Sequence, residues 1–423
     1  LAGGIPALVA TPFHRFAGRP VYARLLSSIL RVAHADVLYC TPEVAEICTG
    51  EPDVPLGSAR VLTTAPPATG ALPAETALAT PEGVAMIQYS SGSTGDAKGV
   101  VLTHRAILDN LRSTRDGLES GPADVSVNWV PLYHDMGLID TYLRPLLSGS
   151  RTVLIPTPDF VRNPALWLWA IDRYRATISW APNFAYSLCA ARVASRELEG
   201  LDLSSWRVAV NASEPCLGNS IRAFADRFAS YGYAPEAMTP AWGLAETVCL
   251  ATAHPVGERP RIEQIDRQAL AAEGVARRVA GEGVESVSVG RCLPNATLEI
   301  RGDDGRPLGD RRVGTIWLRT GSLFERYQGN PELTARVLAG GWLDTGDRGY
   351  VADGYLYFVS REKDLIVVGG EKYAPQDVES AIGRVAGVRE GCAVAFGVMN
   401  EERGTEDVSA VVETKESDEA ALG

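Results

Sequence analysis

The sequence lacks the features that mark several classes of protein. No apolar run approaches the roughly 18 residues that a membrane-spanning helix needs, and no basic stretch followed by an apolar one opens the chain. The seven cysteines are scattered, without a C-x-x-C pair or a nearby histidine at metal-ligand spacing. We therefore expect no membrane insertion, no disulfide framework and no zinc site, and we expect a reducing, cytoplasmic location.

Positive charge is also scarce. The 423 residues carry 40 lysines and arginines against 52 aspartates and glutamates, which gives a net charge of −12. Because nucleic acids and anionic membrane surfaces are bound by clustered lysine and arginine, we expect neither as a main partner. The hydrophobic content of 46% is ordinary for a globular protein, and the length predicts a large domain plus a smaller one.

Short β-rich runs alternate with amphipathic helical stretches in the middle of the chain. The expected strands are residues 126–130, 151–155, 177–180 and 207–210, and helices are expected at 163–174 and 219–228. This alternation is typical of a parallel α/β architecture. From about residue 287 onward strands and turns dominate, which predicts a β-rich annex after the α/β body.

The most informative segment runs from Tyr89 to Val100. It follows an apolar run that is expected to be a buried strand and precedes an expected helix start at Thr103. Its glycines let the backbone turn N–H groups toward one centre, its hydroxyls add donors and Lys98 adds positive charge, a combination that suits a triphosphate. The spacing differs from that of the Walker loop. Taken alone, the segment is equally compatible with a Gly/Ser surface turn.

Four other segments contain residues suited to chemistry. The proline-led turn in Trp129–Ile139 is expected to place His134 at the carboxyl edge of a sheet, where α/β folds bind ligands. Ala241–Thr247 has an aromatic ring for a purine and a carboxylate suited to Mg²⁺. Gly341–Asp347 has an aspartate that can accept both ribose hydroxyls, and Ser360–Gly370 is a charged linker. Each taken singly also fits a purely structural role.

All five segments, in this order, resemble the core motifs of the adenylate-forming (acyl-activating) superfamily. Residues 129–139, 176–189 and 373–379 resemble the fatty acyl-AMP ligase branch most closely. The resemblance implies an α/β fold, with a large adenylation domain of parallel sheets and a β-rich annex over residues 1–361. A small α+β lid domain over residues 362–423 is expected after a hinge near Lys363. Both ends are expected to be incomplete, because the family's first strands and its C-terminal Gly-Lys pair are not found between Leu1 and Gly423.

The resemblance also assigns roles to residues. The catalytic residues it implies are His134 beside the reacting carboxylate, Glu246 as the carrier of Mg²⁺ and Lys363 at the hinge. The residues it implies for ATP are Ser91, Ser93, Thr94, Gly95 and Lys98 at the phosphates, Ser213, Glu214, Trp242 and Gly243 at the adenine, and Asp347 and Arg361 at the ribose. The residues expected in the acyl pocket are Asp140, Arg144, Trp180, Asn183 and Phe184.

The implied reaction uses ATP and Mg²⁺ to convert a carboxylic acid to acyl-AMP and pyrophosphate. Both reactants are anions, so charge neutralisation and positioning would carry the chemistry. The acyl group would then pass to the phosphopantetheine thiol of an acyl carrier protein, as in polyketide or nonribosomal peptide biosynthesis. Residues 255–286, interpreted as an insertion, and the run at 373–377 favour the carrier over free coenzyme A. The alternatives are an acyl-CoA ligase and a degenerate ATP-binding or carrier-docking module.

Two residues depart from the branch at positions expected to line the acyl tunnel, where it has small side chains. Trp180 adds more volume than an open tunnel can absorb. A buried Asp140 needs a partner, and Arg144, four residues later on the same helical face, could supply it. A short or polar substrate is expected if these residues line the pocket. The alternative is that Asp140 and Arg144 form a surface salt bridge that points away from it.

Overall fold

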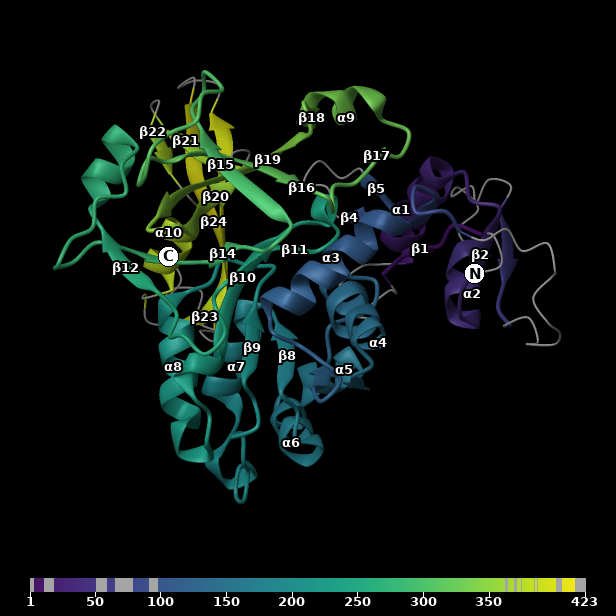
Figure 1. Ribbon diagram of the computed structural model, residues 1–423, viewed down its shortest axis with the longest axis horizontal. Helices are drawn as coiled ribbons and strands as arrows, with labels where there is room; N and C mark the ends of the chain where they lie inside the picture. The colour runs from purple at the N-terminus through teal and green to yellow at the C-terminus, as the bar shows by residue number, and fades with distance from the viewer. Residues whose placement is uncertain are drawn as a thin grey trace.

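A seven-stranded sheet forms the centre of the computed structural model (Figure 1). The structure describes residues 4–10, 19–50, 59–64, 79–90, 98–361, 364–368, 371–373, 375–383, 385, 387–400 and 405–414. The sheet has the order β14-β11-β10-β9-β8-β6-β7, and its strands are β6 (Val125–Asn128), β7 (Arg151–Leu154), β8 (Ile178–Ala181), β9 (Val208–Asn211), β10 (Met238–Gly243), β11 (Leu250–Ala253) and β14 (Arg291–Cys292). Strands β6 to β10 are parallel, whereas β11 and β14 pair antiparallel.

Helices cover both faces of this sheet. One face carries α3 (His104–Gly117), the π-helical segment η1 (Met136–Leu143) and α4 (Arg144–Ser148), and the other carries α6 (Ala165–Tyr174), α7 (Asn183–Arg192) and α8 (Gly218–Phe228), with α5 (Thr157–Arg162) beside α6. Thr103 caps α3, because its Oγ1 accepts the N–H of Ala106 at 3.1 Å. The predicted parallel α/β body and the predicted helix start are confirmed.

Smaller sheets surround this body. A four-stranded sheet contains β1 (Ala7–Leu8), β4 (Val84–Ser90), β5 (Lys98–Thr103) and β17 (Arg326–Tyr327). The predicted β-rich annex is confirmed as β15 (Ala296–Arg301), β16 (Gly314–Thr320), α9 (Pro331–Val337), β18 (Leu338–Ala339), β19 (Trp342–Ala352) and β20 (Tyr355–Arg361). Residues 255–286 contribute β12 (Ile262–Ile265) and most of β13 (Val284–Val287), which form an antiparallel pair.

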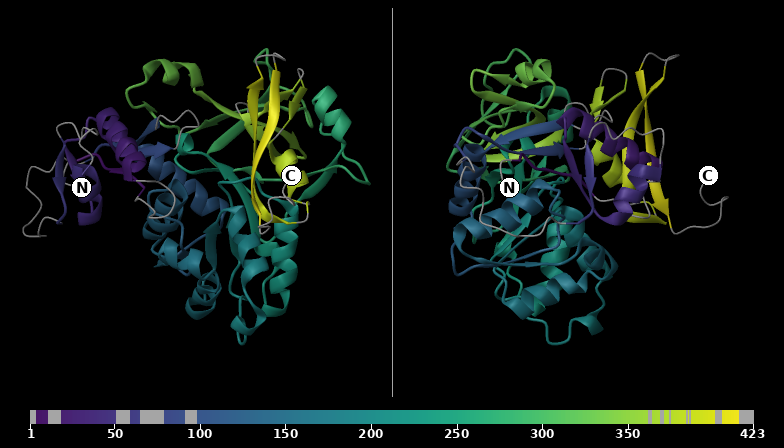
Figure 2. Two further views of the ribbon diagram at one scale, coloured as in Figure 1. Left: turned by 180° about the vertical axis from the view of Figure 1, so that it is seen from behind. Right: turned by 90° about the vertical axis from the view of Figure 1, so that its right-hand side faces the viewer.

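The two ends of the described chain lie far apart. The N-terminal part contains α1 (Arg19–Ala33), β2 (Val37–Tyr39), α2 (Pro42–Gly50) and β3 (Arg60–Leu62), with a small core of its own around Leu26 and Ile47. The C-terminal part contains β21 (Ile366–Val368), β22 (Glu371–Tyr373), α10 (Pro375–Ile382), β23 (Val388–Asn400) and β24 (Thr405–Thr414). Figures 1 and 2 show α1 and α2 at one end of the long axis and the β23–β24 hairpin toward the other.

The π-helical segment η1 is packed unusually close to the turn that precedes it. A Cβ on Gly137 would lie 2.1 Å from the main-chain oxygen of Pro131, so only glycine fits there. The side chain of Thr141 donates back to the main-chain oxygen of Gly137, within the same segment. The sequence predicts a helix after the turn but does not predict its wider π geometry.

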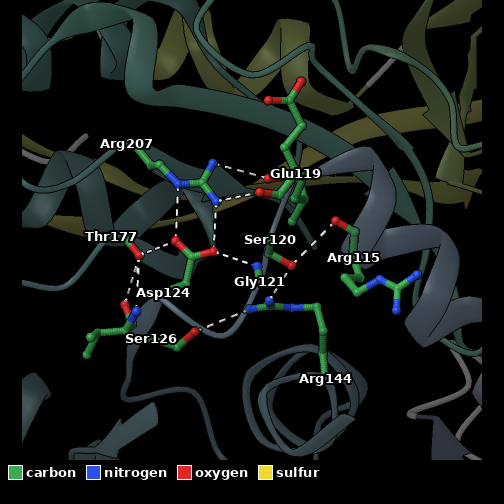
Figure 3. A network of polar contacts seen from close by, with 11 residues as sticks. Arg115, Glu119, Ser120, Gly121, Asp124, Ser126, Arg144, Thr177 and Arg207 are labelled. Carbon is green, nitrogen blue, oxygen red and sulfur yellow. Dashed lines mark hydrogen bonds and ion pairs between the residues drawn. The ribbon is translucent and has the colours of Figure 1, made fainter. Parts of the chain in front are cut away.

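A polar network joins the amino ends of the central strands (Figure 3). The guanidinium of Arg207 donates to both carboxylate oxygens of Asp124, at 3.1 and 2.9 Å, and Thr177 donates to the same carboxylate at 2.6 Å. The main-chain N–H of Gly121 also donates to the Asp124 carboxylate, at 2.8 Å. Burial alone would raise the pKa of Asp124, but the hydrogen bonds outweigh it and hold the pKa below its usual range.

Replacing Asp124 by alanine is expected to lower the free energy of unfolding by about 2 kcal/mol, because Arg207 would lose a paired charge while keeping part of its hydration. Since the folded-state pKa is lowered, this stabilisation is present above the ordinary aspartate pKa of 3.8 and is lost as the pH falls through the lowered value. Urea unfolding measures both effects. Glu273→Ala is the control, because its pair with Arg277 is about half exposed. Equal losses in the two variants would contradict the prediction.

Candidate active site

An open cavity of about 2490 Å³ lies at the carboxyl ends of the parallel strands. Its lining includes residues of the segments that follow β6, β8, β9 and β10, and it extends to the annex and to the segment after residue 363. The predicted site residues that line it are Lys98, His134, Trp180, Asn183, Phe184, Ser213, Glu214, Trp242, Gly243, Glu246, Asp347 and Arg361. The chain thus brings together side chains that are up to 263 positions apart, from Lys98 to Arg361. Ser91, Ser93, Thr94, Gly95 and Lys363 lie outside the described residues.

Asp347 lies on β19 between two donors. Trp242, at the end of β10, donates its indole N–H to Asp347 Oδ2 at 2.9 Å, and the Nε of Arg361 lies 3.5 Å from Oδ1. Burial raises the pKa of Asp347 to about 6, although Arg361 and Trp242 oppose the rise. Trp242 packs against the annex core, so in this structure its indole also orients the carboxylate. The sequence did not predict this second role.

Glu246 lies on a short helical turn, η5 (Ala245–Thr247), where β10 turns back toward β11. The hydroxyl of Tyr327, on β17, donates to Glu246 Oε1 at 2.6 Å. The ammonium of Lys98 lies 5.4 Å from the centre of the Tyr327 ring. Tyr327 therefore connects the carboxylate predicted to carry Mg²⁺ with the lysine predicted to contact the phosphates. Sequence reasoning missed Tyr327, because neither its spacing nor its neighbours in the chain point to Glu246.

Gly243 allows the sharp return between β10 and β11. A Cβ at this position would lie 1.8 Å from the main-chain oxygen of Cys249, which is closer than any side chain permits. Val248, in the same turn, has a φ of 73°, a conformation that is strained for a β-branched residue. Glu246 lies on this turn, between Gly243 and Val248, and lines the cavity. Gly243, predicted to border the adenine, is required here by backbone packing.

His134 follows the Pro131 turn and lines the cavity. Its Nδ1 lies 2.7 Å from the carboxylate of Asp135, which also caps η1 by accepting the N–H of Met136. Burial would lower the pKa of His134, but Asp135 outweighs it and raises the pKa above 6.5. Asp135 therefore favours the cationic form of His134, beside the site where an anionic substrate is expected.

Asn183 and Glu214 form hydrogen bonds within the cavity wall. Asn183 Oδ1 accepts the N–H of Leu217 at 3.1 Å, and its Nδ2 donates to Ser220, so it links α7 to α8. Glu214 accepts the N–H of Phe184 at 3.0 Å, at the start of α7. Burial raises the pKa of Glu214. Asn183 is only 6% exposed, and its hydrogen bonds stabilise the cavity wall.

Asp140 and Arg144 are fully buried and are not among the residues that line the cavity. Arg144 donates to the main-chain oxygen of Asp140 at 3.0 Å. Its other nitrogens donate to Ser120 and Ser126 at 2.9 and 3.3 Å (Figure 3). The predicted side-chain ion pair is therefore wrong, and so is the alternative of a surface salt bridge. The physical reason is that the two serines at the network around Asp124 draw the guanidinium away from the Asp140 carboxylate.

Comparisons with known proteins agree on one family. The family described as AMP-binding enzyme matches residues 22–328. The chain is 40% identical to a putative acyl-CoA synthetase of Caulobacter vibrioides, over 95% of this chain and 70% of the relative. It is 35% identical to a medium-chain-fatty-acid–[acyl-carrier-protein] ligase of Teredinibacter turnerae, over 72% of this chain and 50% of the relative. It is 33% identical to a long-chain-fatty-acid–AMP ligase of Mycobacterium bovis, over 79% of this chain and 59% of the relative.

Solved structures show the same relationship. A structure from work on fatty acyl-adenylate ligases of E. coli and L. pneumophila superposes with a TM-score of 0.86 at 32% identity, covering 96% of this chain and 73% of that one. An adenylation–carrier protein complexed with phenylalanyl-adenylate gives a TM-score of 0.81 at 26% identity, over 98% and 63%. Among the described residues, no helix is long and apolar enough to cross a membrane.

Proposed function

The chain belongs to the AMP-binding enzyme family, and on that premise we propose that it activates a carboxylic acid with ATP to form acyl-AMP and pyrophosphate. The motif resemblance to fatty acyl-AMP ligases is confirmed by the relatives and by the superposed structure. The observation that carries the proposal is the meeting of Lys98, Glu246 and Asp347 in one cavity, with His134 on the wall nearby. A cation, a carboxylate for a metal and an acceptor for the ribose are what an ATP-dependent acyl transfer requires.

In the proposed reaction a carboxylate oxygen of the acid attacks the α-phosphorus of ATP. The new bond joins that oxygen to phosphorus, and the bond from the α-phosphorus to the bridging oxygen breaks, so the electron pair leaves with pyrophosphate. Lys98 and the cationic form of His134 reduce the repulsion between the two anions. Asp347 accepts the ribose hydroxyls and fixes the nucleotide, with Arg361 beside it. No side chain of the protein becomes covalently attached.

Glu246 fits the role of a magnesium ligand. Mg²⁺ is commonly bound by one or two carboxylates together with substrate phosphates, and Glu246 lines the cavity with its position fixed by Tyr327. When bound, Mg²⁺ would neutralise charge on the phosphates. Tyr327 would keep the Glu246 carboxylate oriented toward it.

We further propose that residues 1–361 form the adenylation domain and residues 362–423 part of a lid that moves about a hinge near Lys363. The supporting observation is that Asp364, Glu379 and Arg389 line the same cavity as the nucleotide residues. A lid that contacts the site can close it for adenylation and open it for the acceptor.

The proposed acceptor is the phosphopantetheine thiol of an acyl carrier protein. The ligase of Teredinibacter turnerae is named for such a carrier, and one structural neighbour contains a carrier domain. The thiol would attack the acyl carbon and release AMP. Free coenzyme A is the second candidate, because the relative from Caulobacter vibrioides is named as a putative acyl-CoA synthetase.

Two assays on the complete natural polypeptide that contains this chain test the proposal. We expect acid-dependent ATP–pyrophosphate exchange, and we expect faster thioester formation with a phosphopantetheinylated carrier protein than with coenzyme A. A carrier that bears serine without the arm is the control. Thioester formation with coenzyme A alone would reverse the order of the two acceptors, and absence of exchange with every acid would contradict adenylation.

A further inference from the structure

A buried side chain of α3 bridges the turn that carries Glu246. The side-chain amide nitrogen of Asn110 donates two hydrogen bonds, to the main-chain oxygen of Thr247 at 3.0 Å and to that of Leu250 at 2.8 Å. We propose that Asn110 is a positioning residue for the proposed adenylation, in which it fixes the place of the Glu246 carboxylate. The inference rests on that function, because it concerns the residue expected to carry Mg²⁺.

The two hydrogen bonds of Asn110 span the strained part of this turn. Thr247 directly follows Glu246, and Leu250 begins β11. Between them, Val248 has a φ of 73° and a ψ of −56°, backbone angles that are rare and strained for a residue with a side chain. Such strain persists only where surrounding contacts determine the backbone. By holding both ends, the amide prevents the turn from opening.

An asparagine side chain suits this bridge. Its NH₂ group has two donors, and the two main-chain oxygens accept them. Asn110 is only 1% exposed, and its neighbours Ile107 and Leu111 on α3 belong to the main hydrophobic core. Water therefore does not reach the bridge to replace a lost donor, so both oxygens depend on the amide.

A second set of contacts joins Glu246 to the same helix. Its main-chain oxygen accepts the N–H of Phe324 at 2.8 Å, and its carboxylate accepts a hydroxyl from the same segment, residues 322–327. This segment begins at Ser322, a fully buried residue whose hydroxyl donates to the carboxylate of Asp109 at 3.2 Å. Asp109 directly precedes Asn110 on α3. The turn and the segment that orients its carboxylate are therefore both anchored on α3.

The helix α3 also follows directly from the strand that contains Lys98. This strand, β5, begins at Lys98 and ends at Thr103, which caps α3. One helix thus fixes the cation expected at the phosphates relative to the carboxylate expected at the metal, and both groups must meet the same nucleotide. We therefore expect Asn110 to affect the use of Mg²⁺ and ATP, and to have no effect on KM for the acid.

The experiment replaces Asn110 by alanine in the complete natural polypeptide and uses whichever of butanoate, octanoate and dodecanoate gives the fastest ATP–pyrophosphate exchange. We expect the Mg²⁺ concentration for half-maximal exchange to rise about tenfold, the scale of one lost buried hydrogen bond. KM for the acid should stay unchanged. In the protein without ATP and metal, the amide hydrogens of residues 244–250 should exchange faster with solvent, because the turn is no longer bridged.

Three further variants separate positioning from general stability. Thr252→Val is the matched control, because it removes a buried hydrogen bond of β11, from the Thr252 hydroxyl to the main-chain oxygen of Val289, and should change neither measurement. Asn110→Asp keeps the shape, and its protonated carboxyl donates to one oxygen at most, so we expect a smaller shift in the same direction. Adding Val248→Gly to Asn110→Ala should recover part of the loss, because glycine adopts this φ without strain.

The outcomes distinguish a failed positioning role from a failed function. An unchanged Mg²⁺ dependence in folded Asn110→Ala, or an equal shift in Thr252→Val, would overturn the role of Asn110 alone. If Asn110→Ala does not fold, Asn110→Asp decides the question by the same two measurements. Absence of exchange with all three acids in the unmodified protein would instead contradict adenylation, and the amide exchange of residues 244–250 would still decide whether Asn110 holds the turn.

Discussion

Replacing Glu246 by glutamine is expected to reduce acyl-adenylate formation at least about a hundredfold, because a neutral amide holds a divalent cation far less strongly than a carboxylate. The substitution keeps the shape of the side chain and leaves an oxygen that can still accept the Tyr327 hydroxyl. We therefore expect no change in folding. ATP–pyrophosphate exchange at increasing Mg²⁺ concentration measures the effect, since a weakened metal site should be partly rescued by more metal.

Two companion variants define what the Glu246 result means. Tyr327→Phe removes only the hydroxyl that orients Glu246, so we expect a smaller loss, about tenfold, with the same dependence on Mg²⁺. Glu236→Gln is the matched control, because this glutamate is paired with Arg259 at the surface and is not among the residues lining the cavity. Near-normal exchange by Glu246→Gln would remove Glu246 from the metal site.

Local patterns in the sequence were sufficient to predict much of the fold. The strands β6, β7, β8 and β9 and the helices α6 and α8 lie within a few residues of their predicted positions. These elements are recognised by the spacing of apolar residues, which their own burial dictates. The position of His134 at the cavity could also be predicted, from the segment Trp129–Ile139. The turn that follows a parallel strand lies at the carboxyl edge of the sheet.

Contacts between distant parts of the chain could not be predicted in the same way. The spacing of Asp140 and Arg144 predicts an ion pair, but Arg144 bonds to Ser120 and Ser126, which precede it by 24 and 18 positions. Tyr327 reaches Glu246 across 81 positions. Such contacts depend on how the sheets pack, and a hydrogen bond at the right distance can displace a pair that helical spacing alone would favour.

Asp347 should make the use of ATP depend on pH. Its pKa is raised to about 6, and the ionised form is the one that accepts hydrogen bonds from both ribose hydroxyls. The carboxylate therefore predominates above about pH 6 and is lost below it. We expect kcat/KM for ATP to fall as the pH is lowered through this value, approaching one decade per pH unit at the acidic end.

Replacing Asp347 by asparagine should remove this fall of kcat/KM at low pH, the acidic limb of the pH profile. It should also lower kcat/KM for ATP about a hundredfold at mildly alkaline pH, since hydrogen bonds to a charged acceptor are lost.

Asp140 needs a separate control, because burial raises its pKa to about 6 as well, with Cys249 and Arg144 opposing the rise. Asp140→Asn should keep the acidic limb, because Asp140 is not among the cavity-lining residues. If the limb disappears in Asp140→Asn and persists in Asp347→Asn, the proton that controls ATP binding belongs to the buried Asp140 and not to the ribose site.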